Sequence, residues 1–305
     1  MEARFQYQIA LPYEPGITRR DPSPVIRVDG MYHVWYSRAT ADRSGYFATV
    51  WHATSEDGLF WAEQEKAVGT GPDDAWDGNG IFTPTILVAE ERYWLFYTAV
   101  PKPFDNDGGG PNCTATAIGA AVSDGPNGPW RKLAQNPLLL PSIAPAAFDS
   151  LRVDDACLVV RKGGYWLYYK GRQQQHSPAE TKMGLATAAS PGGPYCKHPA
   201  SPLVDGGHEV CCWPHAGGVA GLFCAVGPDG NSLRWAPDGV TFGKVCSCMP
   251  PAAPGPFRND HFVDGAEPGV RWGLCQDTRS ADRPFLLRFD TDLGTQCFPP
   301  EESKP

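Results

Sequence analysis

Acidic side chains recur at one spacing before similar aromatic segments of the chain. Asp21 lies eleven residues before Tyr32, and Asp155 lies ten residues before Tyr165. The same count from three further segments arrives at Thr83, at His208 or Glu209, and at Asn259 or Asp260. Four of the five places therefore offer an ionisable group. A single Asp before a strand is usually a turn residue that binds its own backbone, but acids at equivalent places indicate a shared site.

Acids that meet in one pocket indicate a particular chemistry. Carboxyl groups held close together raise one another's pKa, so proteins keep them for catalysis or for metal binding. In glycoside hydrolysis, a carboxylate activates water while an acid protonates the leaving oxygen, and in inverting enzymes the two are about 6.5–9.5 Å apart. These residues predict an inverting glycosidase. A carbohydrate-binding protein without catalysis is the alternative.

The segments that follow these positions predict a repeated β-strand. They span residues 32–36, 93–97 and 165–169, with weaker copies at 219–223 and 270–274. The first four are each followed by another strand and a turn that closes on an aromatic residue, as at Asp57-Gly58 before Trp61. Asp-Gly between two strands is a strong hairpin signal, because Gly accepts the positive φ of the turn.

Five copies of about sixty residues, each with room for four short strands, predict an all-β fold, a five-bladed β-propeller. A two-sheet sandwich is the alternative, but it gives no reason for this period. We expect a single domain with blades near 11–65, 76–135, 148–200, 205–248 and 256–298, and residues 4–9 as the strand that closes the last blade. The first strand of each blade lines the central channel, so equivalent positions there form a ring.

Composition agrees with short strands and tight turns. The 305 residues include 34 Gly and 31 Pro, which disfavour long helices, while 42% hydrophobic residues exclude a disordered chain. A net charge of -8 offers no basic surface for nucleic acid or an anionic membrane. No apolar stretch approaches the roughly 18 residues of a membrane span. The start lacks a signal peptide, so we expect a cytoplasmic protein, or a periplasmic or secreted one if a leader is missing.

The ten cysteines do not suggest a metal or disulfide framework. Cys211 and Cys212 are adjacent, and Cys246 and Cys248 are separated by one residue, so neither pair has zinc-knuckle spacing. Most of the others lie in apolar runs. We expect buried, reduced thiols that pack as small hydrophobic side chains.

Several stretches carry a resemblance to known families. Arg20-Asp21-Pro22 resembles the five-bladed glycosidases of families 43 and 32. Longer stretches resemble glycoside hydrolase family 117, the α-1,3-(3,6-anhydro-L-galactosidases), also called α-neoagarobiose hydrolases. These are Arg152-Val153-Asp154-Asp155-Ala156-Cys157-Leu158, Tyr168-Tyr169-Lys170-Gly171-Arg172, Gly207-His208-Glu209-Val210-Cys211-Cys212-Trp213-Pro214-His215, and residues 227–231, 236–239, 272–274 and 284–290. The resemblance covers most of the chain.

The resemblance implies catalytic roles. Asp21 would be the general base, and Asp155 would tune pKa values and orient the sugar. The proton donor would be a histidine, and we place His208 ahead because the blade count puts it level with Asp21 and Asp155. A neighbouring carboxylate, Glu209 or Asp155, would have to keep its imidazolium protonated. Glu209 is the alternative acid, since most propeller glycosidases use a glutamate.

Further residues are candidates for sugar binding. Trp76 would stack on a sugar face and Asp77 would bind hydroxyl groups. Lys170 and Arg172 either reach sugar hydroxyls or form salt bridges on the blade. The remaining candidates are Thr83, Asp260 and, with a structural hydrogen-bonding role as its alternative, His215. No organic cofactor is expected. A metal ion on the propeller axis is left open, because no spacing in the sequence identifies its ligands.

The expected enzyme is an exo-acting inverting glycosidase that releases a terminal 3,6-anhydro-L-galactose from agar-derived neoagaro-oligosaccharides. The alternatives are another propeller exo-glycosidase, of arabinofuranosidase or galactofuranosidase type, and the non-catalytic binding protein. The expected partner is the oligosaccharide, not nucleic acid or membrane. Family members use an N-terminal helical extension in dimer contacts, whereas this chain enters its first blade almost at once. We therefore expect a monomer or a homodimer without that exchange.

Overall fold

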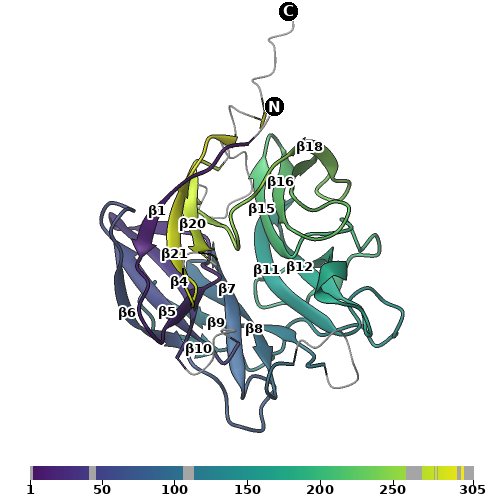
Figure 1. Ribbon diagram of the computed structural model, residues 1–305. Helices are drawn as coiled ribbons and strands as arrows, with labels where there is room; N and C mark the ends of the chain where they lie inside the picture. The colour runs from purple at the N-terminus through teal and green to yellow at the C-terminus, as the bar shows by residue number, and fades with distance from the viewer. Residues whose placement is uncertain are drawn as a thin grey trace, which may run out of the picture.

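The repeated strands form separate sheets around one axis. The computed structural model describes residues 3–40, 46–105, 113–258, 270–277, 279, 281–293 and 297–298. Within these residues the strands form five sheets, which are arranged in a ring (Figure 1). The chain is therefore a five-bladed β-propeller, as its repeat predicts, and not a two-sheet sandwich.

Each sheet is one blade. Blade one contains β2 (Thr18–Arg20), β3 (Ile26–Val28), β4 (Met31–Ala39), β5 (Thr49–Ser55) and β6 (Ala62–Val68). Blade two contains β7 (Gly80–Ala89), β8 (Arg92–Val100), β9 (Ala117–Ser123) and β10 (Arg131–Lys132). Blade three contains β11 (Arg152–Arg161), β12 (Gly164–Arg172), β13 (Lys182–Ala188) and β14 (Cys196–Lys197), with the short helix η1 (Pro178–Glu180) between β12 and β13. Blade four contains β15 (Glu209–His215), β16 (Gly218–Cys224), β17 (Ser232–Ala236) and β18 (Gly243–Ser247). Blade five contains β19 (Gly255–Pro256), β20 (Trp272–Asp277), β21 (Phe285–Asp290) and β1 (Gln6–Leu11).

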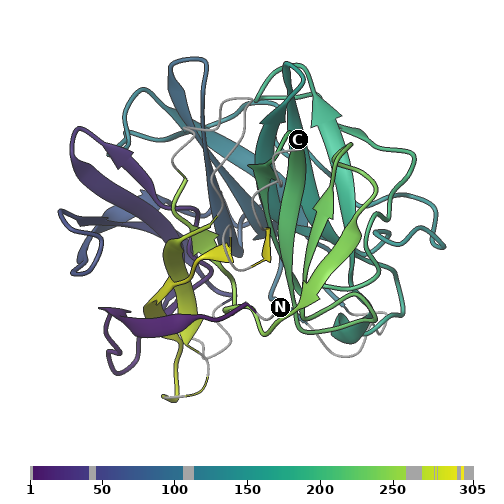
Figure 2. The same ribbon diagram turned by 90° about the horizontal axis from the view of Figure 1, so that it is seen from above.

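The N-terminal strand completes the last blade. Strand β1 pairs antiparallel with β21, with Gln6 opposite Asp290 and Ile9 opposite Leu287. Seen from above, the purple N-terminal strand lies beside the yellow strands of blade five (Figure 2). This is the closing role expected for residues 4–9. Because both ends of the described chain share one sheet, the ring is held closed by a β-ladder.

The aromatic segments form the second strand of the first three blades and bury their side chains between blades. Trp35, Tyr36, Tyr97, Tyr168 and Tyr169 are all fully buried. Burial of a large apolar side chain stabilises a fold by about 1.5–3 kcal/mol. This packing fixes the first strands, whose ends surround the axis. No helix in the described segments is long and apolar enough to cross a membrane.

Candidate active site

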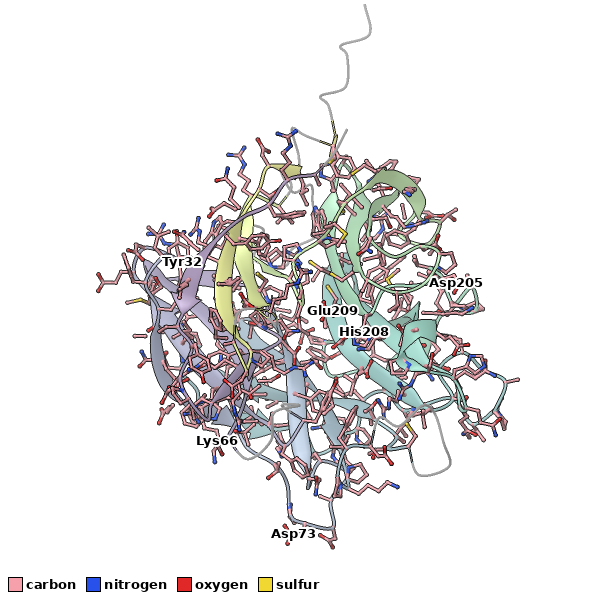
Figure 3. All side chains as sticks on the ribbon, in the orientation of Figure 1. Tyr32, Lys66, Asp73, Asp205, His208 and Glu209 are labelled. Carbon is pink, nitrogen blue, oxygen red and sulfur yellow. The ribbon has the colours of Figure 1, made fainter. Side chains whose placement is uncertain are left out.

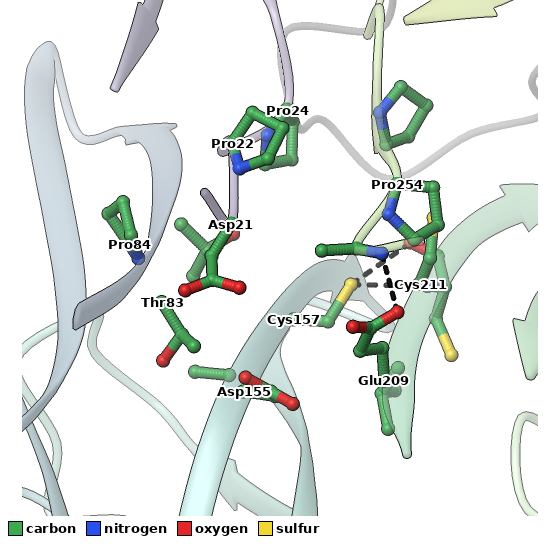
Figure 4. Close-up of a pocket in the computed structure, with 16 residues that line it drawn as sticks. Asp21, Pro22, Pro24, Thr83, Pro84, Asp155, Cys157, Glu209, Cys211 and Pro254 are labelled. Atoms are coloured by element: carbon green, nitrogen blue, oxygen red, sulfur yellow. Dashed lines mark hydrogen bonds between the residues drawn. The ribbon is translucent and has the colours of Figure 1, made fainter. Parts of the chain in front are cut away.

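Four of the predicted residues meet around the propeller axis. Asp21, Thr83, Asp155 and Glu209 come from blades one to four, and all four line the same two cavities. Figure 4 shows their side chains around a common space. The equal spacing found in the sequence therefore corresponds to a ring of residues in the folded chain.

A shared backbone conformation aims three of these side chains at the axis. Asp21, Thr83 and Asp155 have φ angles of 50°, 47° and 50°, a left-handed conformation that is uncommon for residues other than Gly. The ladder shifts register between Phe82 and Thr85, and again after Asp154. Side chains of a regular strand point alternately to the two faces of the sheet. A bulge interrupts this alternation and redirects a side chain. Each of these blades thus presents its ring residue in the same way.

The ring position of blade five is Ala253, which corrects the sequence count. Ala253 has the same left-handed φ, 48°, and lines the cavity beside Pro254. Asp260, which the count placed there, lies outside the described residues. Counting back from Val270 fails because the stretch between ring residue and second strand is longer in this blade than in the others. The described ring therefore has three ionisable members, Asp21, Asp155 and Glu209.

The two cavities differ in character. We call the cavity that contains the residues directly before the ring positions, Arg20, Phe82, Asp154 and His208, the outer cavity. It is also lined by the four shared residues and by Tyr46, Phe104, Arg152, Lys170, Arg172 and Thr181. The inner cavity is lined by residues that follow the ring positions and is mostly apolar, with Pro22, Pro24, Pro84, Pro254, Pro256, Cys157, Cys211 and Cys212. A concave site with a few convergent polar groups is typical of small-molecule binding.

Asp21 is held as an oriented carboxylate. Its Oδ2 accepts hydrogen bonds from Arg20 Nε at 2.8 Å and from Ser37 Oγ at 3.1 Å. Its backbone N–H donates to Gln276 Oε1 at 3.2 Å. A charge-assisted bond from a guanidinium is among the stronger side-chain hydrogen bonds, so it fixes the direction of the carboxylate. This environment suits the general base expected at this position.

Side chains of the second strands hold the ring in place. Ser37 Oγ accepts the N–H of Thr83 at 2.9 Å, and Thr98 Oγ1 accepts the N–H of Asp155 at 3.3 Å. Together with Gln276, these residues connect each ring residue to the blade before it. Sequence reasoning missed all three.

The repeat contains the signal that would have found two of them. Ser37 and Thr98 each lie five residues after the start of an aromatic segment, at Tyr32 and Tyr93. Lys170 occupies the same place after Tyr165. Extending the count forward as well as backward therefore identifies the residues that support the ring.

Lys170 neutralises the carboxylates of blade three. Its Nζ lies 2.7 Å from Asp155 Oδ2 and 3.5 Å from Asp154 Oδ1. Burial opposes the charge of Lys170, but attraction to Asp154 and Asp155 raises its pKa above the ordinary value. Arg172 is also buried and donates to Cys113 Sγ at 3.4 Å. Both side chains line the outer cavity.

Glu209 has the electrostatics of a proton donor. Burial, together with the nearby charges of Asp155 and Asp21, raises its pKa to about 7, against lowering contributions from the Ala253 N–H and Lys170. That N–H donates to Glu209 Oε2 at 2.5 Å. A glutamate with a pKa near 7 keeps its proton for transfer at neutral pH.

His208 does not have such electrostatics. It lies beside Glu209 in the middle of the molecule (Figure 3), and its ring binds the backbone of Pro178. The charge of Lys170 lowers its pKa to about 3, with burial, Arg20 and Arg172 acting in the same direction. Its imidazole is therefore neutral near pH 7. This direction differs from the expectation that a neighbouring carboxylate keeps His208 protonated, because the charge of Lys170, burial, Arg20 and Arg172 all lower its pKa.

Trp76 and Asp77 are placed away from the ring, which corrects their assignment to the sugar site. The Trp76 ring stacks on Tyr97, with centroids 5.8 Å apart, and lies so close to Gly119 that a Cβ there would come within 2.5 Å of it. Asp77 is 3% exposed and pairs with Lys132 Nζ at 2.5 Å. Neither residue lines a central cavity.

Blade three contains an equivalent pair of an aromatic residue and an aspartate. Because the pair recurs in two blades, we interpret it as a structural feature of the fold. Phe148 stacks on Tyr169 with centroids 6.0 Å apart. Asp149 pairs with Lys197 Nζ at 2.5 Å and accepts the Tyr169 hydroxyl at 2.8 Å. The signal was present in the sequence, because Asp77 and Asp149 each precede their ring residue by six positions.

His215 also lies far from the ring. It ends β15, whereas Glu209 begins that strand. Six residue steps of a strand span about 20 Å. The His215 ring packs at 3.9 Å, between centroids, against Phe298. It therefore belongs to the packing between segments and not to the sugar site.

A metal ion on the axis finds no cluster of ligands in the described part of the chain. Among the described residues, His, Cys, Asp and Glu form no group of three or more that could hold one. The ring carboxylates are instead engaged by Arg20 and Lys170.

Comparison with known proteins finds relatives among the glycoside hydrolases. A model of the glycosyl hydrolases family 32 N-terminal domain matches residues 18–184. The structure is similar to that of Zg3597, a family 117 glycoside hydrolase produced by the marine bacterium Zobellia galactanivorans. The TM-score is 0.85 at 28% identity, over 95% of this chain and 91% of that one. This similarity confirms the resemblance to family 117.

Two curated relatives match shorter segments. A bifunctional 6(G)-fructosyltransferase/2,1-fructan:2,1-fructan 1-fructosyltransferase of Allium cepa is 32% identical over 127 residues, 40% of this chain and 19% of the relative. A sucrose-6-phosphate hydrolase of Bacillus subtilis (strain 168) is 34% identical over 89 residues, 29% of this chain and 18% of the relative. The matched segments thus span about a fifth of these relatives.

Proposed function

The chain belongs to the family of the glycosyl hydrolases family 32 N-terminal domain and is a glycoside hydrolase; within that class we propose an exo-acting, inverting enzyme. Its proposed substrate is an agar-derived neoagaro-oligosaccharide, from which it releases the terminal 3,6-anhydro-L-galactose. The similarity to a family 117 structure over nearly the whole chain supports this substrate. One observation carries the mechanism: Asp21, whose carboxylate is held by Arg20 and Ser37, and Glu209, whose pKa is raised to about 7, line one cavity.

The proposed reaction is a single displacement. Asp21 accepts a proton from a water molecule as the water oxygen attacks the anomeric carbon. The bond from that carbon to the leaving oxygen breaks, and Glu209 gives its proton to that oxygen. The electron pair of the broken bond stays with the leaving group, and the anomeric configuration inverts. We assign the acid to Glu209 and not to His208, because its pKa near 7 suits the task and the pKa of His208, about 3, does not.

The other ring residues have supporting roles in this proposal. Asp155, neutralised by Lys170, contributes to the raised pKa of Glu209 and offers an oxygen to sugar hydroxyls. His208, being neutral, offers a hydrogen bond without a charge.

A furanoside is the second candidate substrate. The relatives from Allium cepa and Bacillus subtilis are named for reactions of fructans and of sucrose-6-phosphate, which favours a fructofuranoside. Arabinofuranosides and galactofuranosides belong to the same group of alternatives. The same two acid–base residues would serve any of these substrates.

Hydrolysis of a substrate panel tests the proposal. The panel contains neoagarobiose, sucrose, a short fructan, and aryl arabinofuranosides and galactofuranosides. We expect turnover of neoagarobiose, and NMR of the first anomer formed should show inversion. A retained anomer would overturn the single displacement. Preference for a furanoside would overturn the substrate, and sugar binding without any turnover would favour the non-catalytic alternative.

A further inference from the structure

Two aromatic rings and two guanidinium groups stack along the wall of the outer cavity. The rings of Tyr46 and Phe104 lie 3.8 Å apart at 20°. The guanidinium carbon of Arg20 lies 4.8 Å from the Tyr46 ring centre, and that of Arg152 lies 4.2 Å from the Phe104 ring centre. One face of a ring holds only one planar group at such distances. Arg20 and Phe104 therefore occupy opposite faces of Tyr46, and the four groups form a column, Arg20–Tyr46–Phe104–Arg152.

The column joins three blades. Arg20 ends β2 and Tyr46 lies between β4 and β5 of blade one, Phe104 follows β8 of blade two, and Arg152 begins β11 of blade three. All four line the outer cavity. Phe82, the neighbour of the ring residue Thr83, meets the rings of both Tyr46 and Phe104 edge-on, at 5.2 and 5.7 Å.

The backbone of Tyr46 packs closely against that of Gly80 in blade two. A Cβ on Gly80 would lie 2.2 Å from the Tyr46 carbonyl oxygen, so only glycine permits this approach. At the other end, Arg152 Nε donates to the Thr114 carbonyl at 2.9 Å, and Arg152 donates to the Asp105 carbonyl at 2.5 Å. The column is therefore anchored in the backbone of blade two.

The Arg20 end of the column reaches the proposed base. Arg20 Nε donates to Asp21 Oδ2 at 2.8 Å, the oxygen that also accepts the Ser37 hydroxyl. The final torsion of an Asp side chain is broad and weakly determined by the chain itself. Its carboxylate therefore takes its direction from these two donors. Arg20 has several rotatable bonds of its own, and the face of Tyr46 restricts them through a cation–π contact.

We propose that Tyr46 is a positioning residue: its ring fixes the guanidinium of Arg20, which in turn orients the carboxylate of Asp21 to take a proton from the attacking water. The inference rests on the proposed function, because it assigns a partner to the proposed base. It predicts that the face of the ring matters and the hydroxyl of Tyr46 does not.

Three variants test this role. Tyr46→Leu removes the ring face, Tyr46→Phe keeps it, and Phe104→Leu removes a neighbouring ring while leaving the contact between Arg20 and Tyr46. Because small misplacements of a reacting group can cost up to about 100-fold in rate, we expect Tyr46→Leu to lower kcat at least about tenfold. KM should change much less. Tyr46→Phe should keep kcat near the wild-type value. Phe104→Leu should lower kcat less than Tyr46→Leu does.

A second measurement does not depend on activity. In the wild type, the Nε–H proton of Arg20 should exchange slowly with water and give a distinct NMR signal, assigned by its loss in Arg20→Lys. Tyr46→Phe should keep the signal and Tyr46→Leu should lose it, in variants whose circular dichroism is unchanged.

Equal losses of kcat in Tyr46→Leu and Tyr46→Phe would overturn the positioning role, as would an unchanged Arg20 signal in Tyr46→Leu. A wild-type chain that hydrolyses no member of the panel would overturn the proposed function, and the exchange of Arg20 Nε–H would still decide whether Tyr46 fixes Arg20.

Discussion

Lys132 Nζ lies 2.5 Å from the buried Oδ2 of Asp77, and the Tyr97 hydroxyl donates to the same oxygen at 3.4 Å. Lys132 belongs to the outermost strand of blade two, and Asp77 to the segment that enters its first strand. The ion pair therefore connects the outermost strand of the blade, β10, to the segment before its innermost strand, β7. Lys197 and Asp149 do the same in blade three.

Lys132→Met should destabilise the protein while leaving catalysis intact. The substitution leaves the Asp77 carboxylate, 3% exposed, without its cation. Removing one partner of a buried ion pair costs about 3 kcal/mol or more. Urea unfolding should show this loss, with KM for substrate unchanged. Lys66→Met, at an exposed position on the outer edge of blade one (Figure 3), is the control and should change stability little. A raised KM in Lys132→Met would instead return Asp77 to the sugar site.

Asp21→Asn should abolish turnover and keep sugar binding. The amide preserves the shape of the side chain but cannot take a proton from water. Loss of a general base lowers rate by about 10²–10⁴-fold. Steady-state kinetics measure the loss, and calorimetry with the substrate measures binding. Asp124→Asn, on the exposed surface, is the control. Activity above a few per cent in Asp21→Asn would reject it as the base.

The rate should fall on the alkaline side because Glu209 must be protonated. Its pKa is raised to about 7, so the acid form predominates below that pH and is lost above it. We expect kcat/KM to decrease about tenfold per pH unit well above 7. Glu209→Gln should remove this limb together with most activity, whereas His208→Asn should retain it. If instead the limb disappears in His208→Asn, the histidine is the acid.

The buried pair His33 and His52 should make stability depend on acid. The Nδ1 atom of His33 lies 3.0 Å from the Nε2 atom of His52. Burial lowers the pKa of His33 to about 4 and, with repulsion from His33, that of His52 to about 3. In the unfolded chain both bind protons near pH 6.5, so the unfolded state holds more protons between about pH 6.5 and 4. The free energy of unfolding therefore has its full contribution from the two neutral histidines above pH 6.5. This contribution decreases as the pH falls from about 6.5 to 4.

Urea unfolding from pH 7.5 to 4 measures this dependence. The double variant His33→Gln, His52→Gln should show a shallower slope, whereas His198→Gln, at a partly exposed site, should not. Equal slopes in the wild type and the double variant would show that other groups cause the acid sensitivity.

Thiol reactivity should separate one cysteine from the rest. Cys196 is exposed, and the other nine cysteines are buried. Burial raises the pKa of Cys211, Cys212 and Cys224 well above the ordinary value, which suppresses the reactive thiolate. A disulfide reagent should titrate about one thiol in the native protein and all ten after denaturation, and Cys196→Ser should remove the native reaction. Fewer thiols after denaturation would reveal a disulfide.

The sequence alone determined the five-bladed fold and most of the ring. The repeat is a local property: the first three blades set ten or eleven residues between the ring residue and the start of the aromatic second strand. Counting therefore found Asp21, Thr83 and Asp155, which adopt one backbone conformation in three blades. The count failed in blade five, where Ala253 takes the position, because the connection there has a different length.

Only the tertiary structure gave the two candidate acids, His208 and Glu209, their different pKa values and showed which aromatic–acid pairs belong to the fold. The pKa values of His208 and Glu209 depend on charges from Arg20, Asp21, Asp155 and Lys170, which lie on other blades. Asp77 likewise takes its role from Lys132, fifty-five residues away. Electrostatic energy depends on distance in space and on burial, and neither can be counted along the chain. Spacing in the sequence therefore located the site, and the packing of the blades set its chemistry.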